Sequence, residues 1–431
     1  MTDGLAGLIA RWALPAASRI PPDVQAKMQT HLADSVAIAH AASVRRVGRD
    51  ITAVAARSGG NGPARVLGST SVRLGPTGAA FANAALVHAL DLDDIHDAAR
   101  LHPTAVTLPA ALAAADLVGA DQAGVARAAA VGNELMCRLG TAVAPDGTGP
   151  ASGWFLTQLL GYVGAAVTAG LLLGLDEAAV VSSIGLATMQ AAGAKQAGFG
   201  TGSTARAIYP AFAAEGGVRS ALLAEGGFVG PARGLDGEAG MFPLYLGGRL
   251  DASQARRLVD SERRWDFLDT QLKRWPSCRL SHPYIAATLR ARPLVPADRV
   301  SRIVVEANRA AARLCRPLES RTRPVTLADA KYSVPFMVAF TLVHGEPTLA
   351  GLTDASLTDA AVLHVASLVE VVETGTDSPG EPGAHIAFTG DGHQEIVTAT
   401  GTPPMSPAEA RRKLAACLAG SSSDDLPFVP G

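Results

Sequence analysis

Residues 88–113 read HALDLDDIHDAARLHPTAVTLPAALA, a stretch in which a dense polar cluster runs into an apolar segment. Its first nine residues carry five imidazole or carboxylate side chains, and its last ten are almost all Ala, Leu, Val or Thr. Imidazole and carboxylate groups are costly to bury unless they are paired or functional. The stretch therefore predicts a helix over about 104–118, preceded by either a functional site or a solvated helix end.

The segments around this stretch have the same helical character. Pro residues at 21–22 open a helix in which small or apolar residues recur in steps of three or four up to residue 39. Further helices are predicted over about 77–94, 121–139, 157–174, 176–190 and 210–225. If the first of these is continuous, His88, Asp91 and Ile95 share one face. Hydrophobic residues make up 48% of the chain and aromatic residues only 5%, which favours closely packed Ala- and Leu-rich helices.

The sequence changes character near residue 265. Runs of β-branched residues predict strands at 302–307, 385–388 and 395–400. Helices are predicted over 331–343 and 360–372, a Gly/Pro-rich loop over 375–383, a last helix over 408–418 and a frayed tail over 421–431. We therefore predict a mainly α fold: a large all-helical domain of residues 1–264, completed by 401–431, with a smaller α+β lid domain inserted at 265–400.

Composition excludes several classes of protein. The net charge is −2 and no long Lys/Arg block is present, so we expect no nucleic-acid partner. The four cysteines (Cys137, Cys278, Cys315 and Cys417) form no CxxC pair, which argues against a disulfide framework and for a reducing compartment. The N-terminus lacks a basic segment before an apolar one, and four glycines interrupt the apolar residues 159–175. We expect a cytoplasmic protein that does not enter a membrane.

Two specific sites could also explain the polar cluster. Residues 91–94 spell DxDD, which class II terpene cyclases use to protonate an alkene. Those enzymes line the pocket with aromatic residues, and a chain with only 5% aromatic residues argues against this interpretation. Asp93, His96 and His102 have side chains that suit several divalent ions. However, neither HExxH nor facial-triad spacing is present. We therefore expect no metal ion and no cofactor.

Four stretches resemble, in order, the motifs of the MmgE/PrpD family. Residues 88–113 resemble H-x-L-D-[FY]-D-D-T-H followed by H-P-[ST], and residues 206–231 (RAIYPAFAAEGGVRSALLAEGGFVGP) resemble K-x-L-H-P-G-x-A-A…G-F-T-G-P. Residues 273–287 (KRWPSCRLSHPYIAA) and 330–339 (AKYSVPFMVA) are similar to K-x-[FY]-P-x-C-x-x-[TS]-H-x-x-I-D-A and A-x-[FY]-S-L-P-Y-x-V-A. The resemblance covers most of residues 5–420.

The resemblance implies a helical domain closed by an α+β lid, an active site between them, and a homodimer. Family enzymes remove a proton next to a carboxylate without a metal, then expel water or carbon dioxide or return the proton to the other face. The resemblance carries over Asp91, His102 and Lys273 as catalytic residues and His282 as a substrate-binding residue. We add Tyr209 to the catalytic set and expect Arg206, Asp94, His96 and Cys278 to bind the substrate. Structural alternatives stay open: His102 as a helix-entry residue, Lys273 as a surface lysine, His282 and Cys278 as packing residues.

The chain departs from the family pattern at four positions. Ile95 replaces a threonine, and Phe155 replaces the histidine of a G-W-H-P-T stretch. Arg206 replaces a lysine, and Tyr209 replaces the following histidine. Arginine keeps the positive charge but does not act as a base. We predict a metal-independent lyase for a small carboxylate, with dehydration or decarboxylation; the alternatives are an epimerase of a dicarboxylate and a non-catalytic ligand-binding relative.

Overall fold

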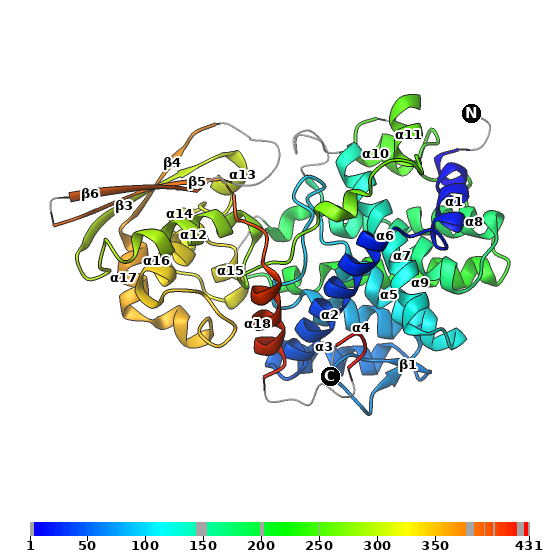
Figure 1. Ribbon diagram of the computed structural model, residues 1–431, viewed down its shortest axis with the longest axis horizontal. Helices are drawn as coiled ribbons and strands as arrows, with labels where there is room; N and C mark the ends of the chain where they lie inside the picture. Colours follow the sequence, from blue (N-terminus) through cyan, green and yellow to red (C-terminus); the bar gives the residue numbers. More distant parts are fainter. Residues whose placement is uncertain are drawn as a thin grey trace. The chain divides into compact units, whose positions relative to one another are not determined.

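The structure of the protein is a computed structural model that describes residues 4–143, 153–198, 202–248, 250–375, 383–391, 393–399, 401–419 and 426–429. The chain forms two compact units (Figure 1). The first comprises Met1–Lys195, Ala207–Leu272 and Ala408–Gly431, and the second comprises Gln196–Arg206 and Lys273–Pro407. Helices dominate the described residues and the longer strands all belong to the second unit. The predicted mainly α fold with an α+β segment is therefore confirmed.

The first unit is an array of helices with one small antiparallel ladder. Its helices are α1 (Leu5–Ala16), α2 (Pro22–Ser43), α3 (Arg46–Ser58), α4 (Pro76–His88), α5 (Thr104–Val118), α6 (Gln122–Val143), α7 (Leu156–Leu172), α8 (Glu177–Thr188), α9 (Tyr209–Glu225), α10 (Met241–Tyr245), α11 (Ala252–Leu258) and α18 (Pro407–Cys417). The ladder pairs β1 (Ala64–Arg65) with β2 (Arg73–Leu74). A 3-10 helix, η4 (Asp266–Asp269), follows α11.

Helix α7 is the centre of the first unit. All its residues from Leu156 to Gly170 are buried, as its apolar sequence predicts, and α5, α6, α8 and α9 pack around it. Two glycines make this packing possible. A Cβ added at Gly132 of α6 would lie 2.0 Å from Oγ1 of Thr168 in α7, and one added at Gly217 of α9 would lie 2.3 Å from Cβ of Ala165. Larger residues at these two positions would push the helices apart.

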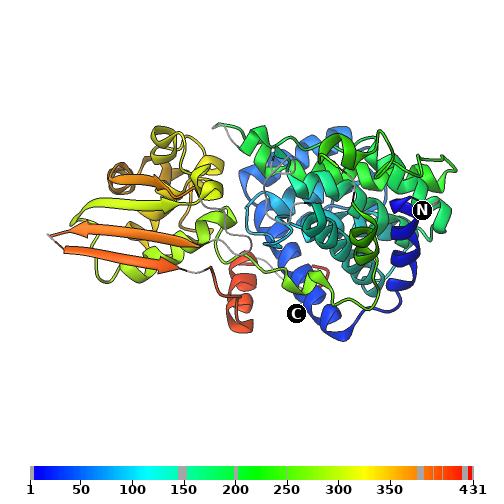
Figure 2. The ribbon, with the colours of Figure 1, turned by 90° about the horizontal axis from the view of Figure 1, so that it is seen from above.

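The second unit carries a four-stranded mixed sheet with the order β4-β3-β5-β6 (Figure 2). Its strands are β3 (Val300–Ala307), β4 (Val369–Glu373), β5 (Ala384–Gly390) and β6 (His393–Ala399). Its helices are α12 (His282–Ala291), α13 (Arg309–Ala312), α14 (Leu318–Thr322), α15 (Leu327–Lys331), α16 (Val334–His344) and α17 (Ala360–Ser367). Helices α12 and α16 share a core with one face of the sheet (Figure 1).

Two predicted helices are wrong in part. The helix predicted over 77–94 ends at His88, so His88, Asp91 and Ile95 do not share a helical face. Asp91 adopts a left-handed backbone with φ of 56°, which a helix does not accept and which Asp tolerates better than most residues. The helix predicted over 360–372 ends at Ser367, and the β-branched residues 369–373 form strand β4 instead. Helices α1 and α3 were not predicted.

Part of the predicted C-terminal organisation lies outside the described residues. This holds for residues 376–382 of the predicted Gly/Pro-rich loop and for residues 421–425 and 430–431 of the predicted tail. By compactness, residues 265–272 pack with the helical unit, whereas residues 196–206 and 401–407 pack with the α+β unit. No helix in the described part of the chain is long and apolar enough to cross a membrane.

Candidate active site

The loop between α4 and α5 carries the polar cluster, and backbone hydrogen bonds hold it in place. Ile95 exchanges two backbone hydrogen bonds with Gln271, at 2.9 and 2.8 Å, and His96 N donates to Leu101 O at 2.9 Å. These bonds tie the loop to residues after η4 and close it on itself. Its side chains are therefore held by a fixed backbone, although the loop is neither helix nor strand.

One carboxylate lies between two imidazoles at the base of this loop. Nδ1 of His88 is 2.8 Å from Oδ2 of Asp93, and Nδ1 of His102 is 3.3 Å from the same oxygen. Nδ1 of His102 also lies 2.6 Å from the backbone oxygen of Asp94. The exposed fractions of His88, Asp93 and His102 are 1%, 0% and 8%. The polar cluster is thus buried, and its interpretation as a solvated helix end is wrong.

These contacts define which ring nitrogen of each histidine carries the proton. A carbonyl oxygen and a carboxylate oxygen only accept hydrogen bonds, so Nδ1 donates in both His88 and His102. Each neutral ring therefore keeps its lone pair on Nε2. For His88 that Nε2 atom is buried and has no hydrogen-bond partner among the described residues.

Two of the four departures from the family pattern contact each other beside this cluster. Tyr209, the first residue of α9, stacks on Phe155 with ring centroids 4.2 Å apart and an interplanar angle of 14°. The Tyr209 ring also meets the His88 ring at 4.7 Å in a T-shaped arrangement. Both aromatic residues are buried. A stacked aromatic pair therefore stands where the family motifs have two histidines.

Asp94 holds the start of helix α5. Its Oδ2 atom accepts hydrogen bonds from Oγ1 of Thr104 at 2.5 Å and from Nδ1 of His31 at 2.7 Å. Oδ1 faces the backbone N of Thr104 at 3.3 Å. Asn133 extends the network by donating to Oγ1 of Thr104 at 2.9 Å. Because both carboxylate oxygens of Asp94 are used within this buried network, its geometry is that of an anchor for α5.

Both ring nitrogens of His96 are engaged by the backbone. Nε2 donates to the backbone oxygen of Asp266 at 2.9 Å, and Nδ1 accepts a hydrogen bond from the backbone N of Ala99 at the same distance. Burial lowers the pKa of His96 below its ordinary value, because the charged form is poorly solvated there. His96 thus holds the loop together as a neutral ring.

Lys413 of helix α18 links the loop to helix α2. Nζ of Lys413 lies 2.8 Å from the carboxylate of Asp34 in α2 and donates to the backbone oxygen of Leu92 at 2.9 Å. Burial raises the pKa of Asp34, and the nearby ammonium group opposes that shift. Sequence analysis missed this pair because 379 positions separate its members and neither residue belongs to a motif.

Asp91, which the sequence assigned to catalysis, is 95% buried in the same loop, and its backbone N donates to His88 O at 2.8 Å.

The second unit holds a cluster of positive charge around Arg206. Nε of Arg206 donates to Ala197 O at 2.5 Å, its guanidinium lies 4.6 Å from the Tyr332 ring centroid, and Nη1 is 3.8 Å from Asp329. Arg321 is fully buried nearby, and burial together with the charge of Arg206 lowers its pKa. Arg321 donates to Arg316 O at 3.1 Å and to Tyr332 O at 3.2 Å, so two buried guanidinium groups lie near the single carboxylate of Asp329.

The other predicted site residues of the second unit are also inside it. Lys273 and His282 are fully buried, so the alternative of Lys273 as a surface lysine is wrong. His282 lies with Nε2 3.2 Å from Trp275 O and its ring 5.1 Å from the Trp275 ring. Cys278 is partly buried, and its backbone N donates to Lys331 O at 3.0 Å.

His88, Asp93 and His102 are also near enough to be considered as metal ligands. In the described part of the chain they are the group of three whose ligand atoms lie within 4.8 Å of one another. His96, which the sequence grouped with Asp93 and His102, is not part of it. An ion at Nδ1 of His102 would have to displace the hydrogen bond to the Asp94 carbonyl. The contacts of these atoms are those of a hydrogen-bonded cluster.

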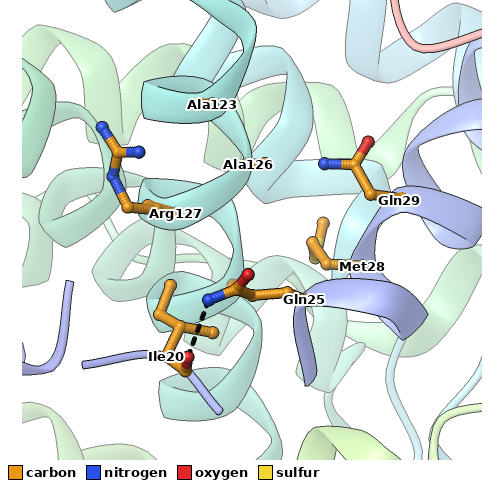
Figure 3. A pocket seen from close by; sticks show the side chains of 8 residues that line it. Ile20, Gln25, Met28, Gln29, Ala123, Ala126 and Arg127 are labelled. Atoms are coloured by element: carbon orange, nitrogen blue, oxygen red, sulfur yellow. Dashed lines mark hydrogen bonds between the residues drawn. The ribbon is translucent and has the colours of Figure 1, made fainter. Parts of the chain in front are cut away.

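A cavity of about 120 Å³ lies between α2 and α6 and shares no lining residue with the cluster. Figure 3 shows Gln25, Met28 and Gln29 of α2 on one side and Arg127 of α6 on the other. Nε2 of Gln25 donates to Ile20 O at 2.8 Å. No imidazole or carboxylate lines this cavity. It therefore offers no general base.

These observations define a mainly helical protein with a buried imidazole–carboxylate cluster. The chain matches the MmgE/PrpD N-terminal domain over residues 8–253 and the MmgE/PrpD C-terminal domain over residues 275–426. It belongs to the MmgE/PrpD family, as its motifs indicated.

The chain is similar to several curated proteins. It is 26% identical over 309 residues to cis-aconitate decarboxylase of Aspergillus terreus (strain NIH 2624 / FGSC A1156), covering 68% of this chain and 62% of that protein. It is 27% identical over 324 residues to human cis-aconitate decarboxylase, covering 71% and 63%. It is also 27% identical over 370 residues to the cis-aconitate decarboxylase-like protein oryM of Aspergillus oryzae, covering 79% and 75%. The chain thus spans little more than three fifths of the first two relatives.

Proposed function

We propose that this protein is a metal-independent lyase that removes a proton alpha to a carboxylate of a small substrate, followed by dehydration or decarboxylation. The observation that carries the proposal is the orientation of His102. Its Nδ1–H is held by the Asp94 carbonyl at 2.6 Å, which leaves the lone pair on Nε2 to take a proton. Family membership and the similarity to cis-aconitate decarboxylases support the reaction class.

His102 moves the proton in this proposal. In a dehydration, Nε2 takes the proton from carbon, the C–H electron pair forms the double bond, and the hydroxyl group leaves as water with a proton from an acid. In a decarboxylation, His102 starts as an imidazolium that has taken a proton from solvent; the C–C bond to the carboxylate breaks, carbon dioxide leaves, and the electron pair left on carbon accepts that proton. Tyr209 is the proposed acid, because a phenol hydroxyl can donate a proton. Asp91 and Lys273 complete the proposed catalytic set.

Arg206 holds the substrate carboxylate in this proposal. Its guanidinium is buried in the positive cluster of the second unit, where a fixed planar donor suits a carboxylate and does not compete for the proton. His282 and Cys278 complete the binding set on that unit. Asp94 and His96 are retained as supports of the loop that carries His102.

Epimerisation is the second candidate function. It needs two proton carriers and no leaving group, and His102 and Tyr209 are both adjacent to His88, with ring centroids 5.1 and 4.7 Å away. A non-catalytic relative is the third. The proposal also includes a homodimer with no nucleic-acid or membrane partner. We place it in the cytoplasm, where reducing conditions keep cysteines such as its four as free thiols.

The test is a panel of di- and tricarboxylates incubated with the protein in deuterium oxide. A lyase releases water or carbon dioxide and gives an unsaturated or shortened acid, whereas an epimerase incorporates deuterium with no loss of mass. No product and no exchange with any substrate that stabilises the protein against heat would support a binding protein. EDTA should leave the rate unchanged; a loss restored by a divalent ion would overturn the metal-independent proposal.

A further inference from the structure

We infer that Asp93 is a positioning residue that stabilises the protonated form of His102. We also infer that the hydrogen bond from His88 to Asp93 weakens this stabilisation. This inference rests on the proposed role of His102 as the proton carrier. It concerns two residues that the family motifs left without a function. Neither of them needs to touch the substrate.

The first step is the sharing of one carboxylate oxygen. Oδ2 of Asp93 lies 2.8 Å from Nδ1 of His88 and 3.3 Å from Nδ1 of His102. His88 and His102 meet in a T-shaped arrangement at 5.1 Å. The same oxygen therefore serves both rings, and the shorter contact is the one to His88.

The second step is the charge that appears during the reaction. When Nε2 of His102 takes a proton, the ring becomes an imidazolium whose Nδ1 faces the Asp93 carboxylate at 3.3 Å. Asp93 has no exposed surface, so water does not screen this attraction. A buried carboxylate behind a catalytic imidazole stabilises the imidazolium in this way in the serine proteases. Here the Asp94 carbonyl at 2.6 Å already fixes the tautomer, so Asp93 is left with the electrostatic part.

The third step is the opposing effect of His88. Its Nδ1–H donates to Asp93 and withdraws part of the carboxylate's charge from His102. Among the described contacts, His88 and His102 are the titratable groups next to the Asp93 carboxylate. Tyr209 contacts the His88 ring, and Asp94, the next residue in the loop, contacts His102 through its backbone oxygen. Removal of the Asp93 carboxylate and removal of the His88 imidazole should therefore shift the pH midpoint of His102 protonation in opposite directions.

The experiment compares Asp93→Asn with His88→Phe, which keeps a ring against Tyr209 but removes the donor. Asp93→Asn should lower kcat about 10- to 100-fold with KM changed less than about 2-fold, and should move the lower limb of the kcat/KM profile to lower pH. His88→Phe should move that limb to higher pH. Glu134→Gln is the matched control, because Glu134 is a buried carboxylate whose contacts are Arg138 and the backbone N of Asp266 and Phe267. It should leave the limb in place.

A second measurement is independent of turnover and of the proposed function. Histidine-selective ¹⁵N labelling reports the protonation of His102 directly, with the signal assigned from a His102→Gln sample. The midpoint should move down in Asp93→Asn and up in His88→Phe. Unmoved midpoints, or shifts of the same sign, would overturn the inference even if His102 proves essential. Tight Zn²⁺ binding by the wild type that Asp93→Asn abolishes would overturn it as well. Failure of the proposed function would instead appear as an active His102→Gln with the midpoints still shifted.

Discussion

The two units each contain a buried carboxylate, and its partners differ in kind. In the first unit, Asp93 is matched with two imidazoles, groups that gain or lose a proton near neutral pH. In the second unit, Asp329 lies near Arg206 and accepts from Thr326 and Gly202, and the guanidinium stays charged throughout. One region is suited to moving protons and the other to holding a fixed charge. Substitutions around Asp93 should therefore change kcat, and those around Arg206 should change KM.

The largest expected effect is that of His102→Ala. Loss of a positioned general base or acid should lower kcat/KM about 10²- to 10⁴-fold. The backbone N of His102 donates to Oγ1 of Thr157 at 3.0 Å, and this bond survives truncation of the side chain. Steady-state kinetics with circular dichroism as the folding control checks the prediction. Retention of near-wild-type kcat/KM would remove His102 from the mechanism and end the contrast between the two units.

The next effect tests a fixed charge inside the first unit. Arg138 is buried against Glu134, donates through Nη1 to Leu258 O at 2.9 Å and Asp260 O at 2.8 Å, and lies 5.0 Å from the Trp12 ring centroid. Arg138→Leu leaves the Glu134 carboxylate buried without its cation, at a cost of about 3–5 kcal/mol.

The Arg138 effect should appear in thermal unfolding and spare the kinetic constants of the folded fraction. Arg264→Leu is the matched control, since its pair with Asp269 is about 60% exposed on both sides and should contribute less than about 1 kcal/mol. A large loss of kcat in folded Arg138→Leu would show that fixed charge in this unit also serves the reaction.

The third prediction concerns the second unit. Arg206→Lys keeps the positive charge but loses the planar fork, the Nε bond to Ala197 and the stacking on Tyr332. A charge-assisted hydrogen bond contributes about 1.5–3 kcal/mol, so KM should rise about 10- to 150-fold with a smaller change in kcat.

Tyr209→Phe is the counterpart of Arg206→Lys. It keeps the stack on Phe155 and should lower kcat with little change in KM. Initial-rate kinetics on the two variants side by side would decide. Lower melting temperatures with unchanged kinetic constants in both would mean that the two residues only pack the start of α9.

The sequence predicted the helices better than the contacts of the His88, Asp93 and His102 cluster between them. The sequence placed α5, α7 and α9 to within two residues at their N-terminal ends, because each begins a long run of small and apolar residues. It did not place the contact between His88 and Asp93, because that contact forms only when the chain leaves the helix at His88 and turns through the left-handed Asp91.

Local sequence patterns also did not predict the contacts between side chains of different helices. Phe155 and Tyr209 were recognised as separate departures, yet their stacking follows from the packing of α7 against α9. The family motifs included His102, Arg206, Asp94 and Tyr332, but nothing in the sequence paired His102 with the Asp94 carbonyl or Arg206 with the Tyr332 ring. The contacts that each side chain makes in the folded protein therefore define its chemical role.

The smallest expected effect separates two histidines of the same loop. His96 has both ring nitrogens on the backbone, and burial lowers its pKa from 6.5, so the unfolded chain takes up a proton that the folded protein resists. Stability from this group is fully present above pH 6.5 and is lost as the pH falls below that value, by at most about 1.4 kcal/mol per pH unit. Thermal unfolding between pH 5 and 8 should therefore show a shallower pH dependence in His96→Asn than in the wild type. His393→Asn, at an exposed position, should follow the wild type. An unchanged slope in His96→Asn would mean that His96 accepts a second proton where it lies, and that the difference between a supporting and a proton-carrying imidazole in this loop is not set by its backbone contacts.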